Sequence, residues 1–478
     1  MKKTGKLLAF VLAMVLLLSA CAESTTGTTA GTIATTGAST VASTTATTKK
    51  TRQTTAPVKF PANHINEDTN FHGETFTFAI LTDSGISGYG ICESEDGIES
   101  VNKAIKERDE YFYDIYNAKI ETVKTSAEAL LSELEAGKCT ADFVYAKQGA
   151  VSTEYCRNIS TMEIEFKDKP WWGVTWPMAV DGKGYALSGS FSLEIFNSAQ
   201  VIFFNKGVKE QIPSLKDVDF YKLTEGYKSK EWTLDKLLEF SRAAYEAGKT
   251  GFVSELNGIS ALYFGAGQTF LSQTEHKSGV TIFEHGFNES AKEITNKIIA
   301  IFGDNSVKTG TKANVYDTFK SGETLFAKGT VGDIEKYFNE KVNFGILPLP
   351  FRGVSEGGIT SVGADTPFLF VLNSGASPEY TECFLWYYVY YSYYIVDNEF
   401  YKCNAYLYST DTESAESFSM IWDSLTFDHA YYNNWLDVNE KYTSAVLAGE
   451  NPIEGFSTGL GEELEAKARE KYGQTLEQ

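Results

Sequence analysis

The chain has 478 residues, a formal net charge of −21 and an aromatic content of 14%. This strong negative charge argues against nucleic acid as a partner, because phosphate backbones are bound by basic surfaces. Only residues 60–478 have the composition to bury a core, and their number suits two lobes better than one small domain.

The first 21 residues have the parts of a lipoprotein signal peptide in the right order. Three lysines, at positions 2, 3 and 6, precede an unbroken apolar run at residues 7–18. Twelve apolar residues are too few to span a bilayer and suit a signal-peptide core. The run ends in Leu18-Ser19-Ala20-Cys21, which resembles the bacterial lipobox. We expect lipidation at Cys21; an ordinary secretory peptide with an incidental cysteine is the alternative.

Residues 22–58 form a segment dominated by Thr, Ser, Ala and Gly. The segment has no periodic apolar pattern and cannot bury a core, so it is predicted to be a disordered tether. A flexible chain of this length has an r.m.s. span of roughly 30–35 Å. We therefore expect the folded part to be held at the extracellular face of the cell membrane by the lipid on Cys21.

Strand and helix patterns alternate at the start of the folded part. Residues 75–81, 118–123 and 142–146 are predicted to be strands, and the first of them passes from alternating to fully apolar. Apolar residues recur at helical spacing between them, over residues 101–115 and 127–134. The order β-α-β-α-β predicts a parallel sheet with right-handed crossovers.

Later segments add strands and helices of mixed order. Strands are predicted at 183–190, 199–205, 324–327 and 342–347, and helical faces at 291–301 and 418–425. Thr233 is the expected N-cap of a helix, with Trp232 packing back onto its first turn. Ser377 and Pro378 open a long helix that contains the aromatic run 386–394. We interpret that run mainly as packing against a lobe, with a ligand platform as the minority alternative.

Six segments of the folded part follow one another in a characteristic order. They are 76–85, 169–172 with its Pro-Trp-Trp, 182–187 running into 201–206, 231–237, 319–329 and 344–350. Together they resemble the extracellular solute-binding proteins of ABC importers, in the maltose-binding-protein-like group (family 1), of the lipoprotein type found in Firmicutes. The resemblance covers nearly all of residues 73–478.

The resemblance implies an α/β fold of the two-lobed periplasmic-binding-protein-like (type II) kind, a clamp with a hinge of crossing strands. It implies lobe 1 at 59–198 and 325–374, and lobe 2 at 199–324 and 375–478. A monomer would capture a small solute, expected to be a sugar or oligosaccharide, and deliver it to ABC transporter permease subunits. Ligand would favour the closed form. Residues 244–250 lack the acidic loop of many relatives, which argues against a calcium site there.

The candidate ligand-binding residues lie where strands end or where the lobes are expected to meet. They are Asp83, Ser84 and Tyr89 after the first strand, Lys147 and Gln148 after the third, Phe191 and Glu194 before the hinge, Tyr263 and Phe264 in lobe 2, and Thr330 and Asp333 after a later strand. Each has a structural alternative: a surface turn for the first group, core packing for the aromatics, and a helix cap for Thr330.

Enzyme motifs are present only in part. The sequence Gly353-Val354-Ser355-Glu356-Gly357 matches GxSxG, but a proline-rich segment precedes it and His429 is the only later histidine. Gly248-Lys249-Thr250 ends like a P-loop, yet Ala243 stands where its first glycine should be. No histidine spacing fits zinc, so we expect no metal, no cofactor and no catalysis. A surface enzyme or adhesin acting on glycans, and a sensor, remain the alternatives.

Five cysteines remain once Cys21 is assigned to lipid: Cys92, Cys139, Cys156, Cys383 and Cys403. An odd number without CxxC spacing does not make a disulfide framework, although one or two bridges are allowed.

Overall fold

The computed structural model describes Asn66 and residues 68–472, except 148, 165, 167–168, 170, 173–178, 182, 225–230, 276–280, 352–359, 362–365 and 410, and except the side chains of 84, 179, 275, 360 and 361. Residues 57–478 form one compact unit. Cys21, the predicted signal peptide and the predicted tether lie outside the described residues. Within the described part, none of the helices combines the length and the apolar character needed to cross a bilayer.

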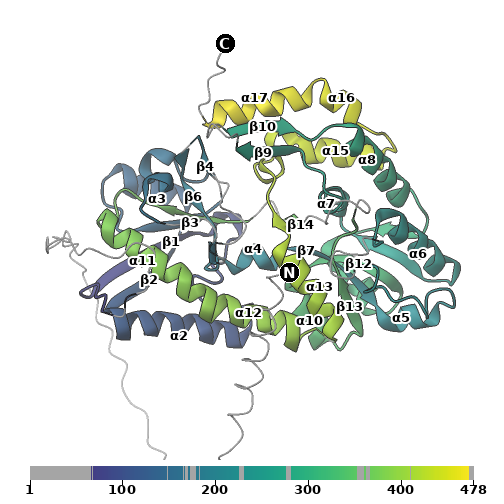
Figure 1. Cartoon of the computed structure of the whole chain (residues 1–478), viewed down its shortest axis with the longest axis horizontal. Helices are drawn as coiled ribbons and strands as arrows, with labels where there is room; N and C mark the ends of the chain where they lie inside the picture. Colours follow the sequence, from purple (N-terminus) through teal and green to yellow (C-terminus); the bar gives the residue numbers. More distant parts are fainter. Residues whose placement is uncertain are drawn as a thin grey trace, which may run out of the picture. The chain divides into compact units, whose positions relative to one another are not determined.

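The first sheet is built mostly from the N-terminal part of the compact unit (Figure 1). Its strands, in spatial order, are β2 (Ala118–Thr125), β1 (Glu74–Leu81), β3 (Phe143–Ala146), β15 (Phe368–Val371) and β6 (Ala186–Leu187). β1 is parallel to β2 and β3, and β15 is antiparallel to β3 and β6. The connecting helices are α2 (Glu99–Tyr116) and α3 (Ala127–Glu135). The predicted β-α-β-α-β unit with its parallel strands is therefore confirmed.

The second sheet lies in the middle of the chain. In spatial order its strands are β11 (Val307–Thr309), β8 (Thr250–Ser254), β12 (Thr324–Thr330), β7 (Gln200–Asn205) and β13 (Phe344–Leu347). β12 is parallel to β8 and β11 is parallel to β8, whereas β7 is antiparallel to both β12 and β13. This mixed pairing buries β7, β13 and nearly all of β12.

The strand pairing corrects the predicted division between the lobes. Residues 325–374 were expected in lobe 1, but β12 and β13 bond to the strands of the second sheet. Residues 375–478 were expected in lobe 2, but α11 (Pro378–Tyr391) packs on the first sheet, where the Phe384 ring stacks 3.8 Å from that of Phe76. The reason is that an apolar strand or helix fits either sheet equally well by pattern, and its partner is set by the tertiary structure.

The aromatic run 386–394 supplies packing, as predicted. Trp386, Tyr387, Tyr388 and Val389 are buried, and the Tyr388 ring lies 4.9 Å from that of Phe78 in β1. The helical path continues from α11 through a π-helical stretch, Ser392–Asp397, into α12 (Asn398–Lys402) and a second π-helical stretch, Cys403–Leu407 (Figure 1). Phe400 of α12 already belongs to a core that includes β7 and β13 residues.

Helices also cover the second sheet. In α6 (Leu234–Glu246) the Thr233 side chain caps the helix by accepting a hydrogen bond from the Lys236 amide, which confirms the predicted N-cap. Other helices are α5 (Lys206–Gln211), α7 (Gly258–Gly265), α8 (Glu289–Phe302), α9 (Lys312–Lys320), α10 (Ile334–Asn339), α13 (Thr412–Asp423), α14 (His429–Tyr432), α15 (Val438–Leu447), α16 (Ile453–Ser457) and α17 (Leu460–Tyr472).

Three small strand pairs complete the described fold: β4 (Ala179–Val180) with β5 (Lys183–Gly184), β9 (Leu271–Glu275) with β10 (Thr281–His285), and β14 (Thr360–Ser361) with β16 (Leu425–Thr426).

Three connections link the two sheets within the described fold. The first runs from β6 to β7 and contains α4 (Leu193–Asn197), the second runs from β13 to β15, and the third is the helical path from α11 to α13. Chain segments from both sheets therefore meet around α4.

Candidate functional site

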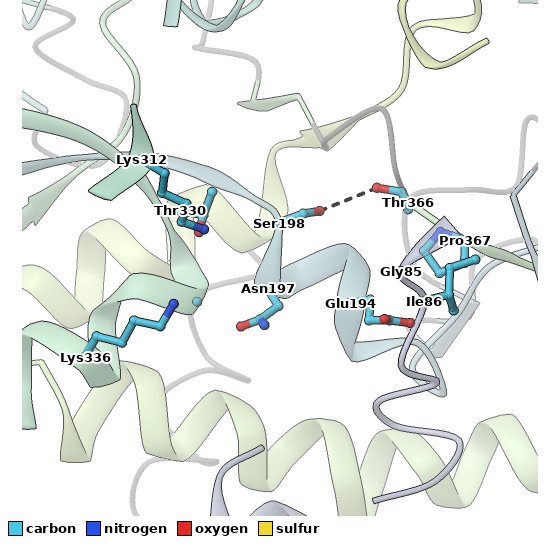
Figure 2. A pocket seen from close by; sticks show the side chains of 11 residues that line it. Gly85, Ile86, Glu194, Asn197, Ser198, Lys312, Thr330, Lys336, Thr366 and Pro367 are labelled. Carbon is cyan, nitrogen blue, oxygen red and sulfur yellow. Dashed lines mark hydrogen bonds between the residues drawn. The ribbon is translucent and has the colours of Figure 1, made fainter. Parts of the chain in front are cut away.

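A cavity of about 490 Å³ opens around α4. The first-sheet side contributes Gly85 and Ile86, which follow β1, together with Thr366 and Pro367, which precede β15. The volume of the cavity falls within the range of small-molecule sites, roughly 300–1,000 Å³. The second-sheet side contributes Lys312 at the start of α9, Thr330 and Gly332 after β12, and Lys336 in α10 (Figure 2). Both sheets thus present the carboxyl end of a strand, β1 or β12, to one cavity, which is where α/β folds bind ligands.

Glu194, in the first turn of α4, lines the cavity and was predicted as a site residue. Its Oε1 atom accepts hydrogen bonds from the Ser87 amide at 2.8 Å and the Ser87 hydroxyl at 2.9 Å. Its Oε2 atom is closed off from solvent, and hydrogen bonds from the Tyr145 hydroxyl and the Gly88 amide also act on the carboxyl group. Burial raises the pKa of the Glu194 carboxyl, and the hydrogen bonds from Ser87 oppose that shift. Glu194 is therefore tied to the loop after β1.

Thr330 also lines the cavity, as predicted for a site residue, and it is at the same time a cap. The Asp333 Oδ2 atom accepts hydrogen bonds from the Thr330 amide at 2.9 Å and from its hydroxyl at 3.0 Å. The other oxygen, Oδ1, lies 3.7 Å from Lys312 Nζ and 3.6 Å from Lys336 Nζ. The predicted site residue Asp333 is nearly buried, and it orders the turn that leads into α10, the helix that carries Lys336.

The wall formed by α4 continues with two neutral polar residues, Asn197 and Ser198. The hydroxyls of Ser198 and Thr366 lie 3.5 Å apart, which joins α4 to the segment before β15 (Figure 2). A Cβ atom at Gly332 would lie 2.9 Å from Asn197 Oδ1. Glycine at position 332 therefore allows the turn after β12 to approach α4 closely.

The remaining predicted site residues lie elsewhere. Asp83 is exposed and its Oδ2 atom accepts a hydrogen bond of 2.8 Å from the Ala127 amide at the start of α3. Lys147 is partly buried after β3. The side chain of Ser84 and the whole of Gln148 lie outside the described residues.

Four predicted aromatic residues pack in the cores and do not line the cavity. The Tyr89 hydroxyl accepts a hydrogen bond of 3.0 Å from the Ile98 amide, and burial raises its pKa. Phe191 belongs to the core of the first sheet, and Tyr263 and Phe264 belong to a core of the second. Core packing, the structural alternative for Phe191, Tyr263 and Phe264, describes their positions; Tyr89 is buried as well and does not lie in a surface turn.

Lys312, Lys336, Asn197 and Ser198 line the cavity but were not among the predicted residues. A sequence signal existed for one of them, because Lys312 directly follows Thr311, the N-cap of a helix after a strand. The others come from short elements whose meeting point no local pattern specifies.

Of the two partial enzyme motifs, the structure describes only the one that resembles the end of a P-loop. The GxSxG segment at 353–357 lies outside the described residues. Gly248-Lys249-Thr250 leads from α6 into β8, whereas a P-loop leads from a strand into a helix. No cluster of three or more His, Cys, Asp or Glu residues able to hold a metal occurs in the described part of the chain. Its five cysteines are free thiols.

Comparison with family models gives no match, and comparison with curated proteins gives none either. Solved structures do match. The sugar-binding protein MalE from the phytopathogen Xanthomonas citri is 12% identical with a TM-score of 0.56, and the match covers 84% of this chain and 100% of that one. The galacto-N-biose-/lacto-N-biose I-binding protein of the ABC transporter from Bifidobacterium longum is 12% identical with a TM-score of 0.54, covering 84% and 98%.

A third match is the cyclic alpha-maltosyl-1,6-maltose binding protein from Arthrobacter globiformis, which is 13% identical with a TM-score of 0.52 and covers 82% and 98%. At these identities the likeness concerns the fold. The chain has the two-lobed, periplasmic-binding-protein-like α/β fold that its sequence predicted.

Proposed function

We propose that the protein is an extracellular solute-binding receptor that captures a carbohydrate between its two lobes and delivers it to the permeases of an ABC transporter. The observation that carries the proposal is the cavity around α4, to which both sheets contribute residues. The solved structures that share the fold are sugar-binding proteins, one of them described as part of an ABC transporter.

The geometry suits capture of a solute by closure of the lobes. Glu194, Asn197 and Ser198 come from a connection between the sheets, and Lys312, Thr330 and Lys336 come from the second sheet. A solute that touches both groups of residues stabilises the form in which they are close, and this differential contact shifts the population towards closure. The three connections between the sheets are the natural place for the hinge.

The sequence supports a membrane anchor as part of the same proposal. The lipobox at Cys21 would place a lipid at the N-terminus, and residues 22–58 would let a monomeric receptor reach permeases in the same membrane. Such a receptor would be a lipoprotein of the Firmicute type that acts as a binding protein and not as an enzyme.

A thermal-shift screen on residues 22–478, with sugars and oligosaccharides as probes, tests the proposal. A solute at one hundred times its dissociation constant should add about 2.7 kcal/mol to the free energy of unfolding. We expect one stabilising sugar, recovered chemically unchanged after incubation. Conversion of that sugar to a product would favour a glycan-active enzyme, and no stabilisation by any sugar would contradict the receptor.

A further inference from the structure

Two lysine side chains line the cavity, and both are more than half exposed to solvent. Lys312 and Lys336 both line it, and their side chains are 59% and 57% exposed (Figure 2). Their Nζ atoms lie 3.7 and 3.6 Å from the same oxygen, Asp333 Oδ1. Hydrogen bonds between an ammonium and a carboxylate are typically about 2.7–2.9 Å long. Neither ammonium is satisfied by this contact, so both keep N–H donors for another partner.

The carboxylate between the two lysines is already committed. The Asp333 side chain is only 9% exposed, and its Oδ2 atom accepts both hydrogen bonds from Thr330. One carboxylate therefore faces two ammonium groups, which leaves this wall of the cavity with a local positive charge. In a chain with a net charge of −21, an exposed lysine pair at a cavity is a local reversal of sign.

The carboxyl group on the opposite wall is already engaged by the loop after β1. Glu194 is the only acidic residue that lines the cavity in the described part of the chain. Its Oε1 atom is bound by Ser87, and its Oε2 atom is closed off from solvent. The other polar groups of this wall, on Asn197, Ser198 and Thr366, are neutral.

The described lining of the cavity offers no ring on which a neutral sugar face could stack. None of its described lining residues is aromatic, whereas the apolar CH face of a sugar is suited to stacking on an aromatic ring. Charge and hydrogen bonding must therefore supply a large part of the specificity.

We infer that the solute carries an anionic group, held by Lys312 and Lys336, with neutral hydroxyl groups facing Asn197, Ser198 and Thr366. This inference rests on the proposed function and narrows its ligand class to acidic carbohydrates. A sugar carboxylate, as in a uronic acid, and a sugar phosphate share the required chemistry.

Calorimetric titration of residues 22–478 with matched sugars separates these sources. The probes are galacturonate against galactose, glucuronate against glucose, digalacturonate against α-1,4-linked galactobiose, and galactose 6-phosphate against galactose. We expect an acidic sugar to bind at least about tenfold more tightly than its neutral partner, and more weakly as salt is added. Tighter binding of the phosphate would identify a phosphoryl group as the anion, and tighter binding of a uronate would identify a carboxylate.

The variants Lys312→Gln and Lys336→Gln should each weaken binding of the acidic sugar by about ten- to a hundredfold, because each removes a charge-assisted hydrogen bond. Lys320→Gln is the matched control, since Lys320 lies at the far end of α9 and pairs with Glu340 at 2.7 Å. It should leave binding unchanged. The melting temperatures of the unliganded variants show whether each one is folded.

The titrations distinguish failure of the anionic-ligand inference from failure of the receptor proposal. Tight binding of a neutral sugar, unaffected by either cavity variant, would overturn the anionic ligand while the receptor proposal stands. The absence of binding by every sugar in the panel, acidic or neutral, would contradict both.

Discussion

Replacing Arg108 by methionine should strongly destabilise the fold next to the cavity. The guanidinium is completely buried under the loop that follows β1. Its Nη1 atom donates to the Gly90 carbonyl at 2.7 Å, and its Nη2 atom donates to the Ile91 carbonyl at 2.9 Å. Nη1 also lies 3.1 Å from the Ser392 hydroxyl, which joins the loop to the helical path after α11.

The size of the effect follows from these contacts. Methionine fills much of the space of the arginine stem but donates no hydrogen bond. Two buried carbonyl groups would then lack a donor, at roughly 1–3 kcal/mol each. Asp109 would also lose its ion pair with Arg108, in which the Arg108 Nη2 atom lies 2.8 Å from Asp109 Oδ1. We expect a loss of about 3–5 kcal/mol, in the range found when one partner of a buried pair is removed.

Urea unfolding of residues 22–478, followed by tryptophan fluorescence, measures this loss. Arg242→Met is the matched control, because Arg242 is 57% exposed and its Nε atom lies 2.7 Å from Asp304 Oδ2. An exposed ion pair should contribute less than about 1 kcal/mol. If Arg108→Met folds too poorly to measure, Arg108→Lys keeps the charge but loses the two-pronged contact, and it should still lose more than the control. Equal, small losses for the buried and exposed sites would refute this reasoning.

Three further predictions concern separate parts of the molecule. Asp397 is buried beside the Ser190 hydroxyl, and burial raises its pKa to about 8, so the unfolded chain loses this proton first and stability falls between about pH 4 and pH 8. Asp397→Asn should nearly equal the parent at pH 4 and exceed it by up to about 5 kcal/mol at pH 8 in urea unfolding; an unchanged difference between the two pH values would contradict the assignment. Trp232→Phe should cost about 1–3 kcal/mol in the same assay, because the buried Pro348 carbonyl loses its 2.8 Å bond from Nε1, and a neutral result would show that the bond is dispensable. Cys21→Ser should release a folded protein into the medium, as seen by cell fractionation, whereas a protein that stays bound and uncleaved would indicate a simple N-terminal anchor.

Local patterns predicted the elements of the fold better than their partners. The strand at 75–81 and the cap at Thr233 were predictable because each depends on residues within a few positions. The sheet to which β12 belongs was not, because its buried residues would suit a central position in either sheet. Its pairing with β7 is decided by contacts more than one hundred positions apart in the chain.

The candidate site was predictable where a polar residue ends or begins an element. Thr330 was predicted in this way and Glu194 from its place before the expected hinge, and both line the cavity. Lys312 and Lys336 were missed because a lysine at a helix surface is ordinarily solvated, and only the turn ordered by Asp333 brings the pair together. Aromatic candidates such as Tyr263 were misleading, because burial uses the same side chains that stacking on a sugar would need.

Titration calorimetry with the best-binding sugar, on the parent and on a variant with a filled cavity, tests whether the solute binds in the cavity around α4. Asn197→Trp places an indole at the α4 wall of the cavity, and Tyr245→Trp, on an exposed position of α6, is the control. We expect the parent and the control to bind one solute per chain. The affinity of Asn197→Trp for the solute should be at least about a hundredfold weaker, equivalent to about 2.7 kcal/mol. Unchanged affinity in the folded Asn197→Trp variant would show that the solute binds elsewhere and would contradict the account.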